Sequence, residues 1–121
     1  TGLMELYSYK NKKYIIVAPK SGAEIVKEGQ TLHHCVGGYC DSHLKGKTNI
    51  LFVREVDKPK KPFYTLEVDT SFNIVQCRGK HNTSYVDHKE LKKFIAGFQV
   101  KKLDILKMKS AQAEQQERKG A

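Results

Sequence analysis

The sequence predicts an α+β fold, in which an antiparallel β-meander of three to five strands has helices packed on one face. Two observations point to this class. Three β-like runs follow one another, with a basic loop and then a tight turn between them, and a run with helical spacing of its apolar residues comes next. The three β-like runs are 49–56, 62–69 and 72–79. The apolar residues at helical spacing are Leu91, Phe94, Ile95 and Phe98.

The N-terminal part predicts further strands and a short helix. Residues 4–18 are rich in Tyr, Ile and Val and predict two short strands, with Asn11 in the turn between them. Ser21 followed by Glu24 is a capping-box pattern, which predicts a helix over about 22–28 that ends at Gly29. A second helical piece is expected over the LHHC stretch, ending at Gly37-Gly38.

The C-terminal part predicts one helix and a polar tail. Asp87 and Glu90 form a second capping-box pattern, and the apolar pattern continues through Leu103, Ile105, Leu106 and Met108. From Ser110 onward there is no apolar stripe. We therefore expect a single α+β domain over 1–109 and a tail, 110–121, that frays or belongs to a neighbouring part. The Thr1-Gly2 start suggests a segment cut from a longer chain.

Charge and cysteine content indicate the partner and the compartment. The 121-residue chain has 22 Lys and Arg against 13 Asp and Glu, a net charge of +9, which favours nucleic acid as a partner. Three widely spaced cysteines favour reduced thiols in the cytoplasm. No apolar stretch approaches the ~20 residues of a membrane helix, so no membrane insertion is expected. The lysines expected to contact phosphates are Lys58, Lys60, Lys61, Lys89, Lys92, Lys93, Lys101, Lys102, Lys107 and Lys109.

The Cys and His residues suggest two kinds of chemistry, neither of them strongly. The candidate zinc ligands are Cys35, Cys40, His43, Cys77 and His81. Their spacing matches no common zinc motif, so we predict no metal, and no other cofactor is indicated. Cys35 directly follows His34, and adjacent helical residues point about 100° apart, which is poor geometry for a nucleophile and its base. His34 is the better functional candidate, because it would point away from a core-facing Cys35.

Alternation along the meander separates two faces. One face is expected to be core and carries Tyr64, Leu66, Val68, Val75 and Cys77. The other carries Thr65, Glu67, Gln76 and Arg78. These polar groups are either the solvated face of a half-buried sheet or a carboxylate–guanidinium pair flanked by an amide and a hydroxyl, which would grip a polar substrate. The spacing alone does not choose between the two.

Four segments in order resemble the PcfJ-like proteins, which are encoded by conjugative plasmids and phages of Gram-positive bacteria. The segments are LHHCVGGY at 32–39, ILFVR at 50–54, PFYTLEV at 62–68 and IVQCRGKHN at 74–82. The resemblance spans about residues 14–100 and implies a set of recurring polar positions. These fall on His34, Cys35, Tyr39, Thr65, Glu67, Gln76, Arg78 and Asn82.

Together these features lead to a hypothesis of function. The domain is expected to be an accessory part of a mobile genetic element that binds nucleic acid or a nucleotide, with cleavage or transfer as a further step. His34, Glu67 and Arg78 would be catalytic. The ligand-binding residues would be Tyr39, Thr65, Gln76 and Asn82. A protein partner from the same element is also considered. The alternative is a non-catalytic protein- or DNA-binding module with a structural polar cluster, and the sequence leaves open whether the domain is an enzyme.

Overall fold

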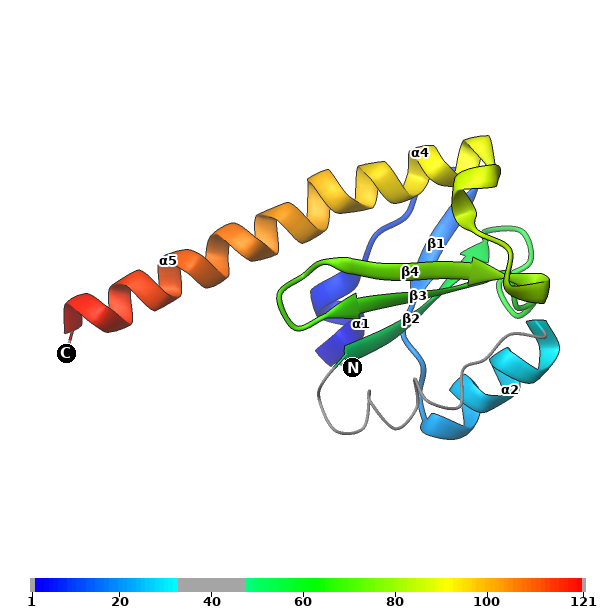
Figure 1. Cartoon of the computed structure of the whole chain (residues 1–121), viewed down its shortest axis with the longest axis horizontal. Coiled ribbons are helices and arrows are strands. Elements are labelled where there is room, and N and C mark those ends of the chain that lie inside the picture. The colour runs from blue at the N-terminus through cyan, green and yellow to red at the C-terminus, as the bar shows by residue number, and fades with distance from the viewer. Residues whose placement is uncertain (1, 33–47, 121) are drawn as a thin grey trace.

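The computed structural model describes residues 2–32 and 48–120 of the chain (Figure 1). Four antiparallel strands form one sheet in the order β1-β2-β3-β4. The strands are β1 (Tyr14–Val17), β2 (Thr48–Glu55), β3 (Tyr64–Asp69) and β4 (Ile74–Gly79). Every neighbouring pair in the sheet is consecutive among these strands, so the predicted antiparallel meander and the α+β class are confirmed.

Helices precede, interrupt and follow the sheet. The α-helices are α1 (Gly2–Tyr7), α2 (Gly22–Leu32), α4 (Lys89–Phe98) and α5 (Asp104–Gly120). Two short 3₁₀ turns, η1 (Lys80–Asn82) and η2 (Tyr85–Asp87), lead from β4 to α4. A π-helical turn, η3 (Gln99–Leu103), joins α4 to α5. Among the described residues, no helix combines the length and apolar character needed to cross a bilayer.

The main core lies between the sheet and α4. From the sheet it takes Leu51, Val53, Leu66, Val68 and Cys77, and from α4 Leu91, Phe94, Ile95 and Phe98. The expected apolar face of this helix is therefore confirmed. Burial of these side chains is the main contribution to the stability of the fold.

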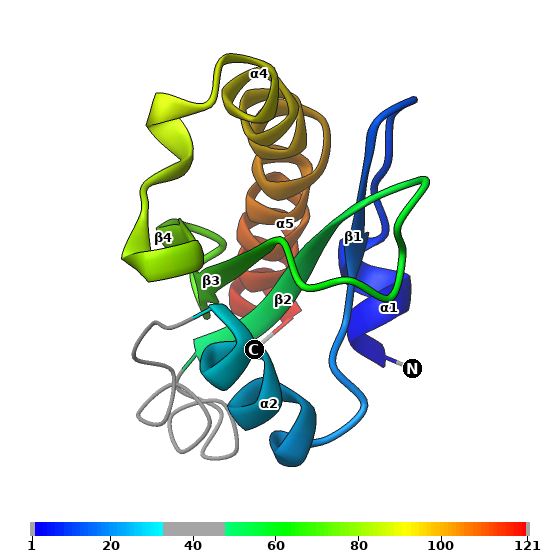
Figure 2. The same cartoon turned by 90° about the vertical axis from the view of Figure 1, so that its right-hand side faces the viewer.

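A second, smaller core lies on the opposite face of the sheet, under α2. Ile25 of α2 packs there against Ile50 and Phe52 of β2. Figure 2 shows α2 and α4 on opposite sides of the sheet. The sequence led us to expect helices on one face, and α2 adds a helix on the other. The reason is that β2 is apolar on both faces, since Ile50 and Phe52 alternate with Leu51 and Val53.

Most of the first predicted strand is a helix, because residues 2–7 form α1. The end of that run does pair with β1 as expected: Lys10 forms an antiparallel bridge with Ile15, and the Ile16 N–H donates to the Tyr9 carbonyl oxygen at 2.9 Å. The aromatic residue that suggested a strand, Tyr7, is buried in the main core, and its hydroxyl accepts a hydrogen bond from Asn49 Nδ2 at 3.2 Å. The predicted turn at Asn11 is confirmed, because its Oδ1 accepts hydrogen bonds from the backbone N–H groups of Lys13 and Tyr14, both at 2.8 Å.

The two capping predictions had different outcomes. Ser21 Oγ accepts from the Glu24 N–H at 3.3 Å, as expected for an N-cap, and α2 continues past Gly29 to Leu32. The predicted cap of the last helix at Asp87 is wrong. Asp87 lies in η2, and His88 is the N-cap, with Nδ1 accepting from the Leu91 N–H at 3.2 Å. An imidazole nitrogen can accept this bond as a carboxylate does.

A β-bulge overturns the expected burial of Val75. Glu67 pairs with Gln76, but the next residue, Val68, pairs with Ile74, so Val75 is the extra residue of the bulge. Val75 is consequently 53% exposed, and Ile74 packs against the main core. Simple alternation cannot detect a bulge, because it assumes an unbroken period of two.

The last helix extends away from the sheet (Figure 1). Leu103 is buried and Leu106 packs against the core, whereas Ile105 and Met108, expected in the same apolar stripe, are exposed. Residues 109–117 are exposed as well. This segment is helical to Gly120, and the division of the chain into a domain over 1–109 and a tail stays a prediction.

Candidate functional site

The predicted polar row lies on the face of the sheet that α2 covers in part. Glu67 and Gln76 are opposite one another on β3 and β4, and Gln76 Nε2 donates to Glu67 Oε1 at 2.9 Å. Thr48 Oγ1 lies 2.9 Å from the other carboxylate oxygen, Oε2, to which it donates. The hydroxyl also lies 3.1 Å from the Val68 carbonyl oxygen. Side chains of three strands thus meet at the Glu67 carboxylate.

Arg78 lies one pair further along the same face. It is opposite Thr65, which is buried, and its own side chain is partly exposed. Within the described part of the chain, Arg78 forms no ion pair, so the expected pair between Glu67 and Arg78 is absent from that part. The carboxylate of Glu67 is instead held by Thr48 and Gln76. Alternation correctly placed all four predicted polar residues on one face.

Asn82 lies beyond the end of β4, in the turn η1. Both His81 and Asn82 have left-handed backbone conformations, with φ of 57° and 62°. The chain then turns back, so that Ser84 forms a bridge with Arg78, and η1 contacts α2. Asn82 is exposed on this turn. It is therefore on the α2 side of the sheet but separate from the row around Glu67.

The remaining predicted residues, His34 and Tyr39, lie outside the described residues, as do Cys35, Cys40 and His43. Across residues 2–32 and 48–120, no group of three or more His, Cys, Asp or Glu side chains could hold a metal ion. Burial raises the pKa of the Cys77 thiol to about 12, which disfavours the thiolate that zinc requires. The absence of zinc from the whole chain stays a prediction.

A buried ion pair that sequence reasoning missed connects α2 to the sheet. Arg54 Nη1 and Nη2 donate to the two carboxylate oxygens of Glu28 at 2.5 and 2.7 Å. The guanidinium also lies over the Phe52 ring, 4.7 Å from its centroid. Burial raises the pKa of the Glu28 carboxyl, and the hydrogen bonds from Arg54 oppose this shift in part.

Two sequence signals could have located this pair. Arg54 continues the series Ile50, Phe52 on a strand whose other face is also apolar, so its side chain points at a second core. Glu28 lies three residues after Ile25 and four before Leu32, within the buried stripe of α2. A charge at a core position of each element indicates a partner on the other.

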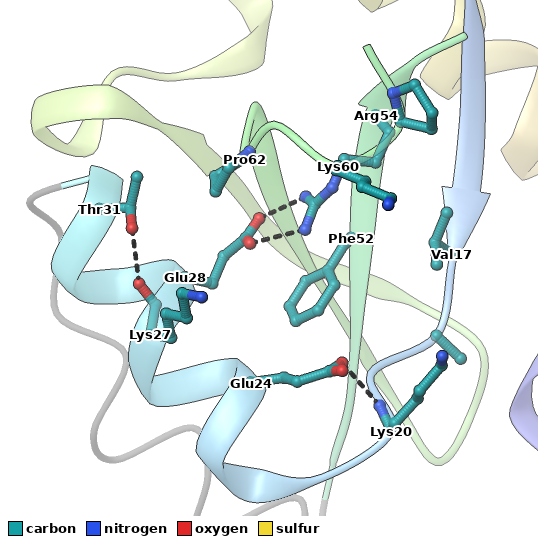
Figure 3. A pocket seen from close by; sticks show the side chains of 12 residues that line it. Val17, Lys20, Glu24, Lys27, Glu28, Thr31, Phe52, Arg54, Lys60 and Pro62 are labelled. Atoms are coloured by element: carbon teal, nitrogen blue, oxygen red, sulfur yellow. Dashed lines mark hydrogen bonds and ion pairs between the residues drawn. The ribbon is translucent and has the colours of Figure 1, made fainter.

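A cavity of about 350 Å³ lies beside this ion pair (Figure 3). It is half open to solvent and is bounded by α2, the end of β1, β2 and the loop between β2 and β3. Its lining combines cationic, acidic and apolar side chains. The residues are Val17, Ala18, Lys20, Glu24, Lys27, Glu28, Thr31, Phe52, Arg54, Pro59, Lys60 and Pro62.

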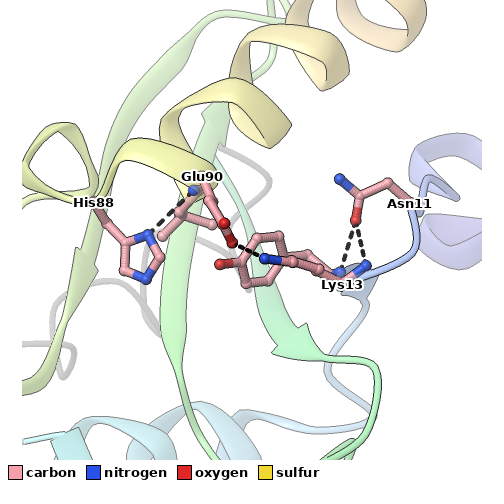
Figure 4. Close-up of polar contacts among 6 residues, drawn as sticks. Asn11, Lys13, His88 and Glu90 are labelled. Atoms are coloured by element: carbon pink, nitrogen blue, oxygen red, sulfur yellow. Dashed lines mark hydrogen bonds and ion pairs between the residues drawn. The ribbon is translucent and has the colours of Figure 1, made fainter.

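A second polar cluster, at the start of α4, is structural (Figure 4). The Lys13 ammonium contacts the Glu90 carboxylate, and this contact lowers the pKa of Glu90 and raises that of Lys13. The side chains of Lys13 and Glu90 are 60% and 52% exposed, so this ion pair contributes little to stability. Because His88 uses Nδ1 as the helix cap, that nitrogen is not free to act as a base in this conformation.

Comparison with known proteins gives a family. The sequence profile of the PcfJ-like protein family matches residues 4–95. A curated relative, described as an uncharacterized protein of Listeria innocua serovar 6a, is 45% identical over an alignment of 71 residues, and the match covers 57% of this chain and 16% of the relative. The chain therefore spans a small share of that relative's length. No solved structure matches the chain.

Proposed function

The chain belongs to the PcfJ-like protein family, and from this starting point we propose that it is an accessory domain of a mobile genetic element that binds nucleic acid or a nucleotide. The proposed contact surface is the α2 side of β3 and β4. Arg78 would neutralise a phosphate there, and Thr65 and Gln76 would fix its position. Tyr39 and Asn82 would add contacts, and His34 with Glu67 would perform acid–base chemistry on the bound ligand.

One observation carries the binding proposal. Arg78 lies on a strand among fixed polar groups, yet among the described residues no carboxylate pairs with it, since Glu67 is held by Thr48 and Gln76. A guanidinium without an ion-pair partner retains its planar pair of donors, which matches two oxygens of a phosphate. The net charge of +9 supports the same class of ligand. The buried free thiol of Cys77 supports placing the domain in the cytoplasm.

The second candidate is a non-catalytic protein- or DNA-binding module. It is favoured by the two hydrogen bonds that Glu67 accepts, because they link β2, β3 and β4 in the way a structural network does. In that case Glu67 would stabilise the sheet and would take no part in chemistry.

Fluorescence anisotropy with labelled RNA and DNA oligonucleotides at low salt tests the binding proposal. Arg78→Lys keeps the charge but loses the planar fork, and should weaken binding about tenfold with little change in melting temperature. Arg78→Gln should weaken it further. Lys10→Gln, which removes one exposed charge before β1, is the control and should have a small effect. Absence of binding by the wild type at low salt, or equal losses for Arg78→Gln and Lys10→Gln, would contradict the proposal.

The same samples distinguish an enzyme from a binding module. Incubated oligonucleotides are separated by length, and free nucleotides are analysed for transfer products. Products that disappear in Glu67→Gln, while binding is retained, identify acid–base catalysis by Glu67. A Glu67→Gln variant that melts several degrees lower, with no products from the wild type, identifies the structural network of the second candidate.

A further inference from the structure

The cavity beside the Arg54–Glu28 pair is separate from the surface that carries Arg78, and its rim is positively charged. Lys20, Lys27 and Lys60 are exposed and come from the loop before α2, from α2 and from the β2–β3 loop. Figure 3 shows them around the Phe52 ring and the ion pair. The volume of about 350 Å³ lies within the range of about 300–1,000 Å³ that is usual for small-molecule sites.

The two carboxylates of the cavity do not cancel this charge. Glu28 accepts both of its hydrogen bonds from Arg54, and Glu24 Oε2 accepts from the Lys20 backbone N–H at 2.9 Å. Within the described residues, no carboxylate forms an ion pair with Lys20, Lys27 or Lys60. The cavity lining therefore has four cationic side chains against two carboxylates, a net formal charge of +2, and its potential favours an anion.

Arg54 supplies a buried donor that is already oriented. Its side chain is 9% exposed and is held in place by Glu28 on one side and the Phe52 ring on the other. A guanidinium has five N–H donors, and Glu28 occupies two of them. Among the described residues, the Arg54 side chain donates no hydrogen bonds other than these two. Its remaining N–H groups can therefore donate to a ligand oxygen, and the side chain does not have to change conformation to do so.

The rest of the lining is apolar. Val17 and Ala18 at the end of β1 and Pro59 and Pro62 in the β2–β3 loop contribute aliphatic surface. In Figure 3, Val17 and Pro62 lie on either side of the Arg54 guanidinium. A ligand that satisfies both halves of this lining has a compact, multiply charged group and a flat apolar group. An acidic peptide fits less well, because it spreads one charge per residue over about 3.3 Å.

We propose that this cavity is a second binding site and that it takes a nucleoside phosphate, with the phosphates at Lys27, Lys60 and Arg54 and the base against Pro62. The same chemical group occurs as a free nucleotide and as the 5′-phosphorylated end of a nucleic-acid strand. Lys20 would add a contact to the phosphates at the other side of the cavity.

Isothermal titration of the chain with ADP, pyrophosphate and a 5′-phosphorylated dinucleotide tests the assignment. The variant Lys27→Gln/Lys60→Gln should bind ADP at least tenfold more weakly and melt like the wild type, because both side chains are exposed. Lys10→Gln/Lys12→Gln removes the same charge from the exposed turn before β1 and should change the affinity less than twofold. ADP should bind more tightly than pyrophosphate, and tighter binding of the dinucleotide than of ADP would identify a strand end as the source.

Three results would overturn this inference. They are no measurable binding of ADP, equal losses in the two double variants, and equal affinity for ADP and pyrophosphate, which would remove the base from the site.

Arg78→Gln separates this site from the proposed nucleic-acid surface. If it abolishes ADP binding while Lys27→Gln/Lys60→Gln does not, ADP occupies the Arg78 surface and the cavity is not the site. If ADP binds as expected and oligonucleotides do not bind at all, the proposed function fails and the cavity stands.

Discussion

At the scale of single residues, Cys77 illustrates how burial determines reactivity. It is 1% exposed in the main core, and desolvation raises the pKa of its thiol to about 12. We expect iodoacetamide at pH 8 to leave Cys77 unmodified in the folded protein and to modify it in denaturant, as measured by mass spectrometry of the peptide that contains it. Equal labelling rates in both states would contradict this burial.

The same residue predicts a pH dependence of stability. Its pKa in the folded state is higher than the ordinary value of about 9, so above that pH the unfolded chain releases a proton that the folded chain keeps. The contribution of this thiol to the free energy of unfolding is therefore fully present below pH 9 and is lost as the pH rises towards 12. Urea unfolding at pH 7 and pH 10 should show a decrease in the free energy of unfolding, and the decrease should be smaller in Cys77→Ala.

The Arg54–Glu28 pair predicts strong non-additivity between two residues. Glu28→Ala leaves a buried guanidinium without its carboxylate and should cost about 3–5 kcal/mol of unfolding free energy. Glu28→Leu/Arg54→Met replaces both charges with apolar groups and should recover most of that loss. Glu24→Ala, in the same helix, is the control and should cost about 1 kcal/mol. A double variant as unstable as Glu28→Ala would show that the ion pair is not the main interaction at this position.

At the scale of elements, the sequence predicted those parts of the fold that depend on local pattern. The strand run at 49–56 became Thr48–Glu55, and the apolar stripe of α4 is buried as expected. The predictions were wrong where a contact with a distant part of the chain determines the local structure. Residues 2–7 form a helix whose Tyr7 reaches the main core, and the bulge at Val75 depends on pairing with β3. The polar row was predictable from alternation, whereas Arg54 and Glu28 lie 26 residues apart.

The π-helical turn η3 predicts that a deletion is tolerated within the turn and not within α4. Leu103 follows Phe98 by five residues and both are buried, because the wider turn takes up the extra residue. Deleting Val100, which is 61% exposed, would leave a spacing of four and keep Leu103 on the same side of an α-helix. We expect a loss of about 1 kcal/mol or less in urea unfolding. Deleting Lys93, also exposed, should cost several kcal/mol, because it turns Leu91 away from Phe94.

At the scale of the whole molecule, the lysines of α4, η3 and α5 predict a salt-dependent contact with nucleic acid in addition to the proposed contact on the α2 side of the sheet. With three phosphate contacts, affinity for double-stranded DNA should fall about 40-fold between 50 and 200 mM salt. Lys101→Gln/Lys102→Gln should reduce the slope of log affinity against log salt by about 2 if both residues contact phosphates. Anisotropy titrations at four salt concentrations measure the slope. Binding that does not change with salt would contradict a contact through phosphates.

The alternation along β3 has an evolutionary consequence. Leu66 and Val68 face the core under α4, while Thr65 and Glu67, their immediate neighbours in the chain, face the α2 side. If the α2 side of the sheet binds a ligand as proposed, selection for folding and selection for binding act on alternate residues of this strand. Relatives that bind a different ligand could then differ at every second residue of β3 and keep the core-facing residues between them. Sequence differences among relatives should therefore alternate along this strand with a period of two.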